Sequence, residues 1–275
     1  MSVSQAIAVE RPPPPARGWP RARIVGYALV CFWILFGLGI VAYLAYAWNG
    51  GQFFNKYAPA YLRGLWTTLS LVIISMIAGA ILSLPVAYGR MSKNRVLSGL
   101  AYCYVYFFRG TPLLVQTYLV YYGVGSFRPE LQTVGLWWFF REAFYCGVFA
   151  FSLNTAAYQA EILRGAIESV PRGQWEGAAS LGLHKLQTLR KIILPQAIVV
   201  ALRPYGNELV LMIKASAIVA IITVYDLMGN AKLAYANSFD IQAYIWVAIV
   251  YLVMVEILRH GVEWIERRIT IHLHR

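Results

Sequence analysis

Charged residues are scarce in this sequence, and few of them are acidic. Only 13% of the 275 residues are charged and 12 are Asp or Glu, whereas 59% are apolar and the mean hydropathy is +0.56. Soluble domains are far less apolar. Because each crossing of a bilayer takes about 20 residues, the chain can form one bundle of several spans. It leaves no room for a large catalytic domain outside the membrane.

Several catalytic and ligand-binding motifs are also missing. No Gly-x-x-x-x-Gly-Lys-Ser/Thr phosphate loop occurs, so any ATP hydrolysis must be supplied by a partner. Gly-x-Ser-x-Gly and His-Glu-x-x-His are absent as well, which argues against an intramembrane enzyme and leaves no catalytic residue to name. Cys31, Cys103 and Cys146 lack metal-ligand spacing, and His272 and His274 lack nearby partner ligands, so we expect no metal site.

Six apolar stretches are long enough to cross a bilayer, and they predict an all-α membrane protein with six transmembrane helices. They lie near residues 24–47, 62–89, 97–123, 143–168, 196–222 and 241–262. The preceding residues 1–23 hold four prolines in a row, which predicts a disordered cytoplasmic tail. Ala45-Tyr46-Ala47 has the form of a signal-peptide cleavage site, but the apolar run before it is longer than the roughly 7 to 15 residues of a signal peptide, so we expect an uncleaved helix.

The net charge of +12 could indicate nucleic-acid binding, but the basic residues are distributed asymmetrically. With both termini in the cytoplasm, most of the 24 Lys and Arg residues fall in cytoplasmic segments. The outer loops then hold only Lys56, Arg63, Arg128, Arg141 and Lys232. This asymmetry is typical of proteins embedded in membrane lipid. It accounts for the basic excess without nucleic acid as a partner and predicts cytoplasmic N- and C-termini.

The segment 171–194 is too polar to cross the membrane, and it separates the fourth and fifth apolar stretches. A helix from about residue 172 to 181 would place Trp175, Ala178, Ala179 and Gly182 on one face, where small side chains permit another subunit to approach closely. Glu176 would lie near the helix start, where a carboxylate is favoured by the dipole and can pair with a basic residue of that subunit. The alternative is an amphipathic helix lying on the lipid surface.

Charges within the apolar stretches are the best indicators of a substrate path, because an unpaired charge at the bilayer centre costs at least about 2.5 to 3.5 kcal/mol. They are Arg109, Glu161, Arg203, Glu208 and Lys214. Asn154 and Tyr158 precede Glu161 by seven and three residues, so all three can face one cavity. There the carboxylate could hold a substrate cation while the amide and phenol bind its other polar groups. The alternative is a structural pair between Glu161 and Arg109 or Arg164.

Arg109 precedes Gly110-Thr111-Pro112, a sequence that breaks helices. Inside a membrane, the backbone groups freed by a break are tolerated only where they line a cavity or meet protein. We therefore consider Arg109 and Thr111 as groups that receive a substrate carboxylate. A kink that turns Arg109 toward the cytoplasmic interface is the alternative.

Several short motifs, in order and spacing, resemble the permease subunits of ABC importers of the polar amino-acid uptake family. The resemblance covers residues 65–268, about three quarters of the chain. Its pieces are Arg109-Gly-Thr-Pro-Leu-Leu-Val-Gln116, Asn154-Thr-Ala-Ala-Tyr158, Glu161-Ile-Leu-Arg-Gly165, Ser169-Val-Pro-Arg-Gly-Gln-Trp-Glu176, Gly182, Leu194-Pro195-Gln196 and Asn207-Glu208. From Asn207 onward the sequence looks most similar to permeases for histidine, lysine, arginine, ornithine and opines. The chain departs from the family in Gly177, where Ala is usual, and in its additional first helix.

The resemblance implies a five-helix type I importer permease core over residues 62–268, preceded by an extra N-terminal transmembrane helix at 24–47. It implies that 171–194 is the cytoplasmic coupling (EAA-like) loop, in which Trp175, Glu176, Gly177, Ala178, Ala179 and Gly182 dock on an ATPase. The implied partners are an ATP-binding cassette ATPase dimer, a second permease subunit of the same or a similar kind, and an extracellular or periplasmic substrate-binding protein. ATP and Mg would be bound by the partner subunits, and this chain would bind no cofactor.

The sequence thus predicts a permease of the bacterial inner membrane that imports a cationic amino acid or an opine. Import of another polar amino acid, such as glutamine, glutamate or cystine, is the first alternative. The second is an ion-coupled secondary transporter that uses Glu161 as a proton site. The third is a membrane scaffold or sensor subunit without a transport path.

Overall fold

The computed structural model describes residues 21–48 and 51–270 and divides into two units, 1–53 and 54–275. The described part of the first unit is mostly one helix, α1 (Arg21–Tyr46), close to the predicted span 24–47. Its apolar side chains are exposed along its length, Leu35 and Val41 among them. The tail predicted over residues 1–23 lies, through residue 20, outside the described residues.

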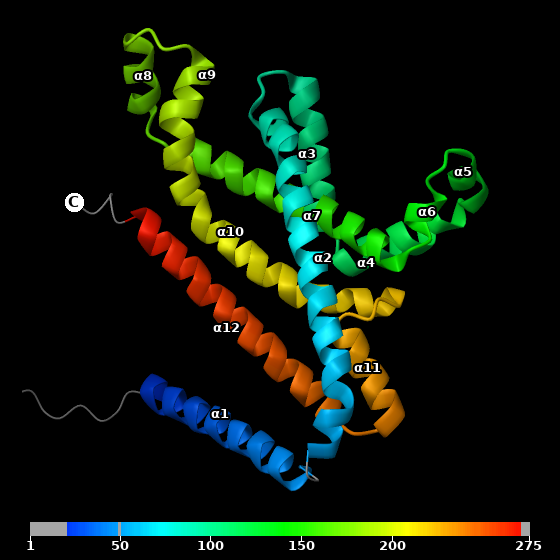
Figure 1. Ribbon diagram of the computed structural model, residues 1–275. Helices are drawn as coiled ribbons and strands as arrows, with labels where there is room; N and C mark the ends of the chain where they lie inside the picture. The colour runs from blue at the N-terminus through cyan, green and yellow to red at the C-terminus, as the bar shows by residue number, and fades with distance from the viewer. Residues whose placement is uncertain (1–20, 49–50, 271–275) are drawn as a thin grey trace, which may run out of the picture. The chain divides into compact units, whose positions relative to one another are not determined.

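The second unit is built from helices, and no β-strand occurs within 21–48 and 51–270 (Figure 1). In chain order they are α2 (Gln52–Met91), α3 (Arg95–Gly110), α4 (Leu113–Tyr118), α5 (Arg128–Thr133), α6 (Trp137–Phe140), α7 (Ala143–Glu168), α8 (Arg172–Ser180), α9 (Lys185–Thr188), α10 (Leu194–Ser216), α11 (Leu227–Ser238) and α12 (Gln242–Thr270). Single π-helical turns follow α4 and α9, at Leu119–Gly123 and Leu189–Ile193, and a 3-10 segment at Ala217–Ile222 follows α10.

The core of this unit is a stack of α7, α10 and α12, with α10 between the other two (Figure 1). Small residues on α7 allow this close packing, since Ala150, Ala156, Ala157 and Ala160 are fully buried. Small side chains are typical of helix contacts in membranes, because lipid offers no hydrophobic drive and close backbone approach must supply the attraction.

The long helix α2 packs through a stripe of small and polar residues. A Cβ atom on Gly79 would collide with the methyl group of Thr155 on α7. A Cβ on Gly64 would lie 2.8 Å from the carbonyl oxygen of Asp226 and 2.9 Å from the Cα of Leu227, at the start of α11. Two glycines therefore set how closely α2 approaches its neighbours.

Four helical segments of the described residues are long and apolar enough to cross a membrane: 23–46, 52–91, 185–222 and 242–269. They match four of the six predicted spans, so the count of six is not confirmed. The predicted third span, 97–123, is divided between α3 and α4 by the break at Gly110-Thr111-Pro112. The predicted fourth span does form one helix, α7, whose second half carries Gln159, Glu161 and Arg164.

The short helices α5, α6 and α11 of the second unit were not predicted, and α11 is the longest of them. Residues 227–238 form α11, which begins after Asp226 and packs against α12. The carboxylate of Asp226 caps the helix by accepting a hydrogen bond of 2.7 Å from the backbone N–H of Gly229. An Asp before an apolar residue is a start signal for a helix, but a short segment of mixed polarity gives no strong helical period.

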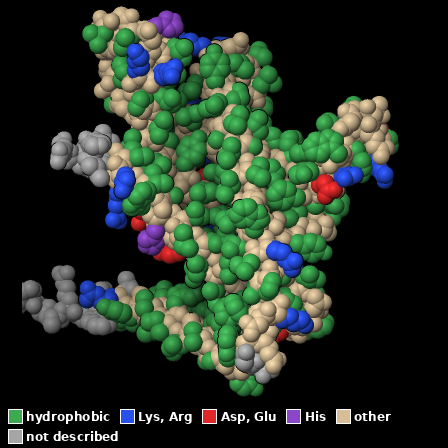
Figure 2. Space-filling view, viewed as in Figure 1, with side chains coloured by type: hydrophobic (Ala, Val, Ile, Leu, Met, Phe, Trp, Pro, Cys, Tyr) green, Lys and Arg blue, Asp and Glu red, His purple; other side chains and the backbone are tan. Residues whose placement is uncertain are grey.

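Hydrophobic side chains dominate the visible face of the molecule over α2 and α3 (Figure 2). On α2, Leu62, Trp66 and Ile81 are each about two thirds or more exposed, as is Leu100 on α3. An apolar surface of this extent is stable only in lipid or against another protein.

We expect Gly79→Ala to destabilise the protein by up to about 2 kcal/mol, measured as thermal unfolding of the purified chain in detergent. The collision with Thr155 costs about 1 to 3 kcal/mol and outweighs the helix propensity of about 1 kcal/mol that Ala gains over Gly. Gly99→Ala is the matched control, because a Cβ there would meet open space. It should raise stability slightly, and equal behaviour of the two variants would contradict the packing argument.

Candidate functional site

The break between α3 and α4 is closed by side chains of the protein itself. The side-chain nitrogen of Gln116 donates to the carbonyl oxygen of Phe108 at 2.9 Å and contacts the hydroxyl of Thr111 at 2.7 Å. Asn154 of α7 also donates to the Phe108 carbonyl, at 2.9 Å, and to the side-chain oxygen of Gln116, at 3.0 Å. These bonds satisfy the freed backbone, as a membrane interior requires.

Asn154 and Thr111, both predicted to lie on the substrate path, are therefore engaged in holding this break. Asn154 is only 7% exposed, and the hydroxyl of Thr111 also donates to the Phe107 carbonyl at 2.8 Å. Gln116 completes the arrangement and received no role from the sequence. The sequence could not predict this contact, because Gln116 lies eight residues after Phe108 and reaches its carbonyl only when the chain turns back at Pro112.

Glu161 lies between two arginines. One carboxylate oxygen pairs with Arg90 of α2 at 2.8 Å, and the other pairs with Arg164 at 2.8 Å. Arg164 also pairs with Glu168 at 2.6 Å. The side chain of Glu161 is 13% exposed, so both of its oxygens are held in a largely enclosed site. The structural pair considered from the sequence is therefore present with Arg164, but the second partner of Glu161 is Arg90 and not Arg109.

Arg109 is exposed, and its guanidinium lies over the ring of Tyr158, 5.1 Å from the ring centre. These two residues and Glu161 line two cavities, of about 400 and 340 Å³. One cavity is completed by α10 residues such as Pro204 and the other by α3 residues such as Tyr106. The structure thus brings together three of the five predicted path residues, with a cation and a phenol on accessible surface.

Glu208 of α10 is the second carboxylate enclosed by this part of the molecule, and it differs from Glu161. It is 6% exposed and accepts a hydrogen bond of 2.9 Å from the hydroxyl of Thr155 on α7. Among the ion pairs found in 21–48 and 51–270, none includes Glu208. Its neighbour Gln159 leaves its side-chain oxygen without a hydrogen-bond donor in the described structure. The pair of helices α7 and α10 therefore encloses a carboxylate that forms no ion pair with the described side chains, although the positive charge of Arg109 acts on it from a distance.

The polar loop 171–194 forms a helical hairpin of α8 and α9, in agreement with the helix expected from about 172 to 181. Trp175 packs on a cluster formed by the end of α7 and the start of α10, which includes Ile167, Ile193 and Ala197. Ala178 is 2% exposed, where α8 meets α9 and the following turn. The face that was expected to receive another subunit is thus turned partly toward the chain's own core.

The opposite side of α8 is open. Glu176, Gly177 and Ala179 are exposed, and a Cβ on Gly177 would meet nothing within 4 Å. Gly182 is also exposed and has a φ of +72°. It ends the helix through the pair of hydrogen bonds from Gly182 N–H to the Ala179 carbonyl and from Leu183 N–H to the Ala178 carbonyl, at 2.9 and 3.1 Å. This is the Schellman arrangement, for which Gly is favoured.

His184, which the sequence left without a role, begins α9. Its ring nitrogen accepts from the Leu186 N–H at 3.4 Å, and Gln187 accepts from the His184 N–H at 3.2 Å. This reciprocal cap fixes the turn between the two short helices. The loop is therefore a preformed projection whose inner face is anchored and whose outer face is free to meet a partner.

An all-helical bundle with a lipid-compatible surface, a broken helix sealed from within and a polar helical projection defines a membrane transport subunit. Residues 79–271 match the family of binding-protein-dependent transport system inner membrane components, and the chain belongs to this family. It is therefore a membrane-embedded permease subunit of an ABC transporter and not an enzyme. This membership also sets aside the ion-coupled transporter and the scaffold as alternatives.

Named relatives agree. The nopaline transport system permease protein NocM of Agrobacterium fabrum is 45% identical over 195 residues, which is 70% of this chain and 81% of that protein. The arginine ABC transporter permease protein ArtM of Escherichia coli is 38% identical over 213 residues, covering 78% and 96%. A crystal structure of an amino acid ABC transporter with histidines has a TM-score of 0.69 and 36% identity, covering 78% of this chain and 96% of that one. The predicted type I importer permease fold is thereby confirmed.

We expect Gly182→Ala to weaken α8, because an Ala at positive φ costs about 1 to 2 kcal/mol. Gly177→Ala should strengthen the same helix by about 1 kcal/mol. Hydrogen exchange of the backbone amides in 171–194 would then be faster in the first variant and slower in the second. Unchanged exchange in both would show that the hairpin is held by its inner face alone.

Glu161→Gln should lower thermal stability by about 1 to 3 kcal/mol, since it leaves Arg90 and Arg164 next to a neutral group in a partly enclosed site. Glu142→Gln is the matched control, because that carboxylate pairs with Arg141 on the surface, where the two side chains are 58% and 54% exposed. The control should change stability by less than about 1 kcal/mol. Equal effects would contradict a structural role for the Glu161 ion pairs.

Proposed function

We propose that this permease imports a cationic amino acid or an opine, and that Glu208 is the carboxylate that attracts the substrate cation. The observation that supports this assignment is that Glu208 is enclosed between α7 and α10 and forms no ion pair with the described side chains, the positive charge of Arg109 acting on it only from a distance. A buried carboxylate in that condition is costly, and a cationic substrate would relieve the cost. Relatives named for nopaline, octopine and arginine transport agree with this substrate class.

Glu161 remains a predicted path residue, but its surroundings favour a structural role. Two arginines already occupy its oxygens, so a substrate cation would have to displace one of them. The cavities beside it offer Arg109 as a group for the carboxylate that every amino acid and opine carries. The path we infer thus binds the anionic part of the substrate near Arg109 and Tyr158 and its cationic part near Glu208.

The partners are inferred from the exposed face of α8 and from the family to which the chain belongs. We infer that an ATPase dimer docks on the outer face of α8, through Glu176, Gly177 and Ala179, and that ATP and Mg are bound there and not by this chain. A second permease subunit, identical or similar, would complete the path, and a substrate-binding protein would deliver the solute from outside. Trp175, Ala178 and Gly182, also expected to dock, would act by fixing the position of α8.

Orientation in the inner membrane is supported by ion pairs within the second unit. Arg90, at the end of α2, pairs with Glu161 near the end of α7, and Arg203, early in α10, pairs with Glu266 near the end of α12 at 2.7 Å. The ends of α2, α7 and α12 therefore lie at the same end of the bundle as α8. Because an ATPase is cytoplasmic, the C-terminus is inferred to be cytoplasmic, and the positive-inside asymmetry supports the same side for the N-terminus.

The test is ATP-dependent uptake of labelled arginine, lysine, octopine, glutamine and glutamate by vesicles holding the full complex. Glu208→Gln should reduce uptake of the cationic substrates by about tenfold or more, the effect of losing one charge-assisted hydrogen bond of about 1.5 to 3 kcal/mol. Glu161→Gln should reduce all uptake in proportion to the amount of folded complex.

Two results would show whether the substrate class or the position of the cation site is wrong. Uptake of glutamine or glutamate with no preference for cations would overturn the substrate class. A cation preference that survives Glu208→Gln and is lost in Glu161→Gln would retain the substrate class and return the cation site to Glu161. Stimulation of the ATPase by the loaded binding protein serves as the control that each variant still couples.

A further inference from the structure

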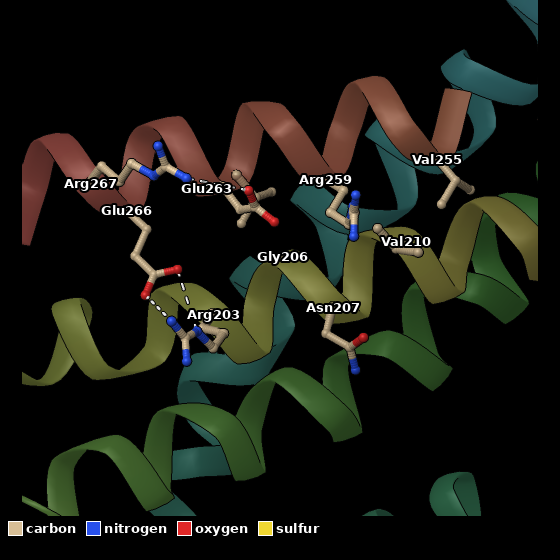
Figure 3. A pocket seen from close by; sticks show the side chains of 10 residues that line it. Arg203, Gly206, Asn207, Val210, Val255, Arg259, Glu263, Glu266 and Arg267 are labelled. Carbon is tan, nitrogen blue, oxygen red and sulfur yellow. Dashed lines mark hydrogen bonds and ion pairs between the residues drawn. The ribbon is translucent and has the colours of Figure 1, made fainter. Parts of the chain in front are cut away.

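A groove of about 600 Å³ lies between α10 and α12, away from the residues assigned to the substrate path (Figure 3). Its charged lining consists of Arg203, Arg259, Glu263, Glu266 and Arg267. Gly206 and Val262 also line it, and they are in such close contact that a Cβ on the glycine would collide with the valine. Both helices are part of the second unit, so the groove is a feature of one packed body.

The polarity of the groove changes along the helix axes. Val210 and Val255 line one end, whereas Arg203, Glu266 and Arg267 lie at the other, near the end of α12 (Figure 3). Arg259 and Asn207 lie between them. A small polar solute would make no favourable contact with the apolar end. A ligand with a charged head and an apolar tail fits the whole length.

The charged end offers both signs of charge. Arg203 pairs with Glu266 at 2.7 Å, while Arg267 and Glu263 are farther apart, at 3.9 Å. The side chains of Arg203 and Arg267 are 80% and 82% exposed, so they can rearrange around a ligand. Arginines suit a phosphate group, and the carboxylates suit an ammonium group. A headgroup with only negative charge would instead meet two carboxylates.

The nearby aromatic residue fits a membrane interface. The guanidinium of Arg268 lies 4.5 Å from the centre of the Trp264 ring, on the same turn of α12. Tryptophan collects at the level of lipid headgroups, and basic pockets between transmembrane helices on the cytoplasmic side bind lipid headgroups. The charged end of the groove is therefore at headgroup depth, with the apolar end toward the hydrocarbon.

We propose that the groove between α10 and α12 binds a phospholipid whose headgroup carries both a phosphate and a primary ammonium. The phosphate is bound by Arg267 and by Arg259, which is 58% exposed and turns to the ligand from its surface partner Glu256, 2.7 Å away. The ammonium is bound by Glu263 and Glu266, and an acyl chain lies along Val210 and Val255. Because α10 carries Glu208 five residues after Arg203, about one and a half turns, a lipid bound here stabilises the helix on which the proposed cation site depends.

Native mass spectrometry of the full-length chain, purified in detergent and stripped of lipid, tests the proposal. The probes are phosphatidylethanolamine, phosphatidylcholine and phosphatidylglycerol. The wild-type chain should bind phosphatidylethanolamine at least about fivefold more tightly than phosphatidylglycerol. Glu263→Gln combined with Glu266→Gln should remove this preference, and each of Arg259→Gln and Arg267→Gln should weaken phosphatidylethanolamine binding by about fivefold, the worth of one arginine near a lipid surface.

Val255→Trp provides a second variant that keeps every charge and fills the apolar end, and it should weaken binding of all three lipids. Arg141→Gln combined with Glu142→Gln is the matched control, since it removes an exposed ion pair elsewhere and should change nothing. Equal binding of the three lipids by the wild-type chain would overturn the proposal. So would groove variants that bind like the control, or occupancy of the groove by a second copy of the chain.

Discussion

The close contact between α7 and α10 is the interaction on which the rest of the structure depends. It is made possible by small side chains on α7, which are fully buried, and it holds a buried hydrogen bond between Thr155 and Glu208. The same two helices continue into the polar hairpin, because α8 follows α7 and α9 leads into α10. Substitution of larger residues along this contact would disturb the enclosed carboxylate and the polar hairpin together.

The two enclosed carboxylates show how environment separates residues that look alike in sequence. Glu161 has arginines on both oxygens and lies at the end of the bundle that carries the hairpin. Glu208 has a hydroxyl donor and no ion pair among the described residues. An ion pair that is already complete fixes helices in place, whereas an incomplete one leaves an attraction for a ligand. Arg164 is a near neighbour of Glu161 in the sequence, but the second arginine, Arg90, is 71 residues away and could not be identified as a partner from the sequence.

Much of the fold could be predicted from sequence because the apolar runs and the polar loop are local signals. The helices at 24–47 and 143–168 were found within a few residues of their observed ends, and the hairpin followed from the charge of 171–194. The helix predicted at 241–262 has the correct start, but α12 continues eight residues further, to Thr270. The break at Pro112 was also recognisable. α11 was missed because a twelve-residue helix of mixed polarity gives no strong period.

The candidate site was less predictable, since its meaning lies in contacts between distant segments. Periodicity placed Asn154, Tyr158 and Glu161 on one side of α7. It could not show that the amide of Asn154 is hydrogen-bonded to Gln116 or that Arg90 forms an ion pair with Glu161. It likewise grouped Trp175 with Ala178 without showing that this face lies against α7 and α10. In both cases the partner came from elsewhere in the chain, and on α8 the predicted face itself is divided, since Ala178 is buried whereas Ala179 is exposed.

The inward face of α8 gives the hairpin a direct mechanical connection to the enclosed carboxylate. Trp175 rests on the cluster where the end of α7 meets the start of α10, and Thr155 lies eleven residues earlier on α7 than Ala166 of that cluster. At 1.5 Å per residue this is about 16 Å of continuous helix. A partner that displaces α8 must therefore move both helices together or change how they pack. Because packed helices shift between discrete arrangements and do not deform gradually, the second outcome would alter the Thr155 to Glu208 contact. Energy applied at the outer face of α8 would in this way reach the site inferred to hold the substrate cation.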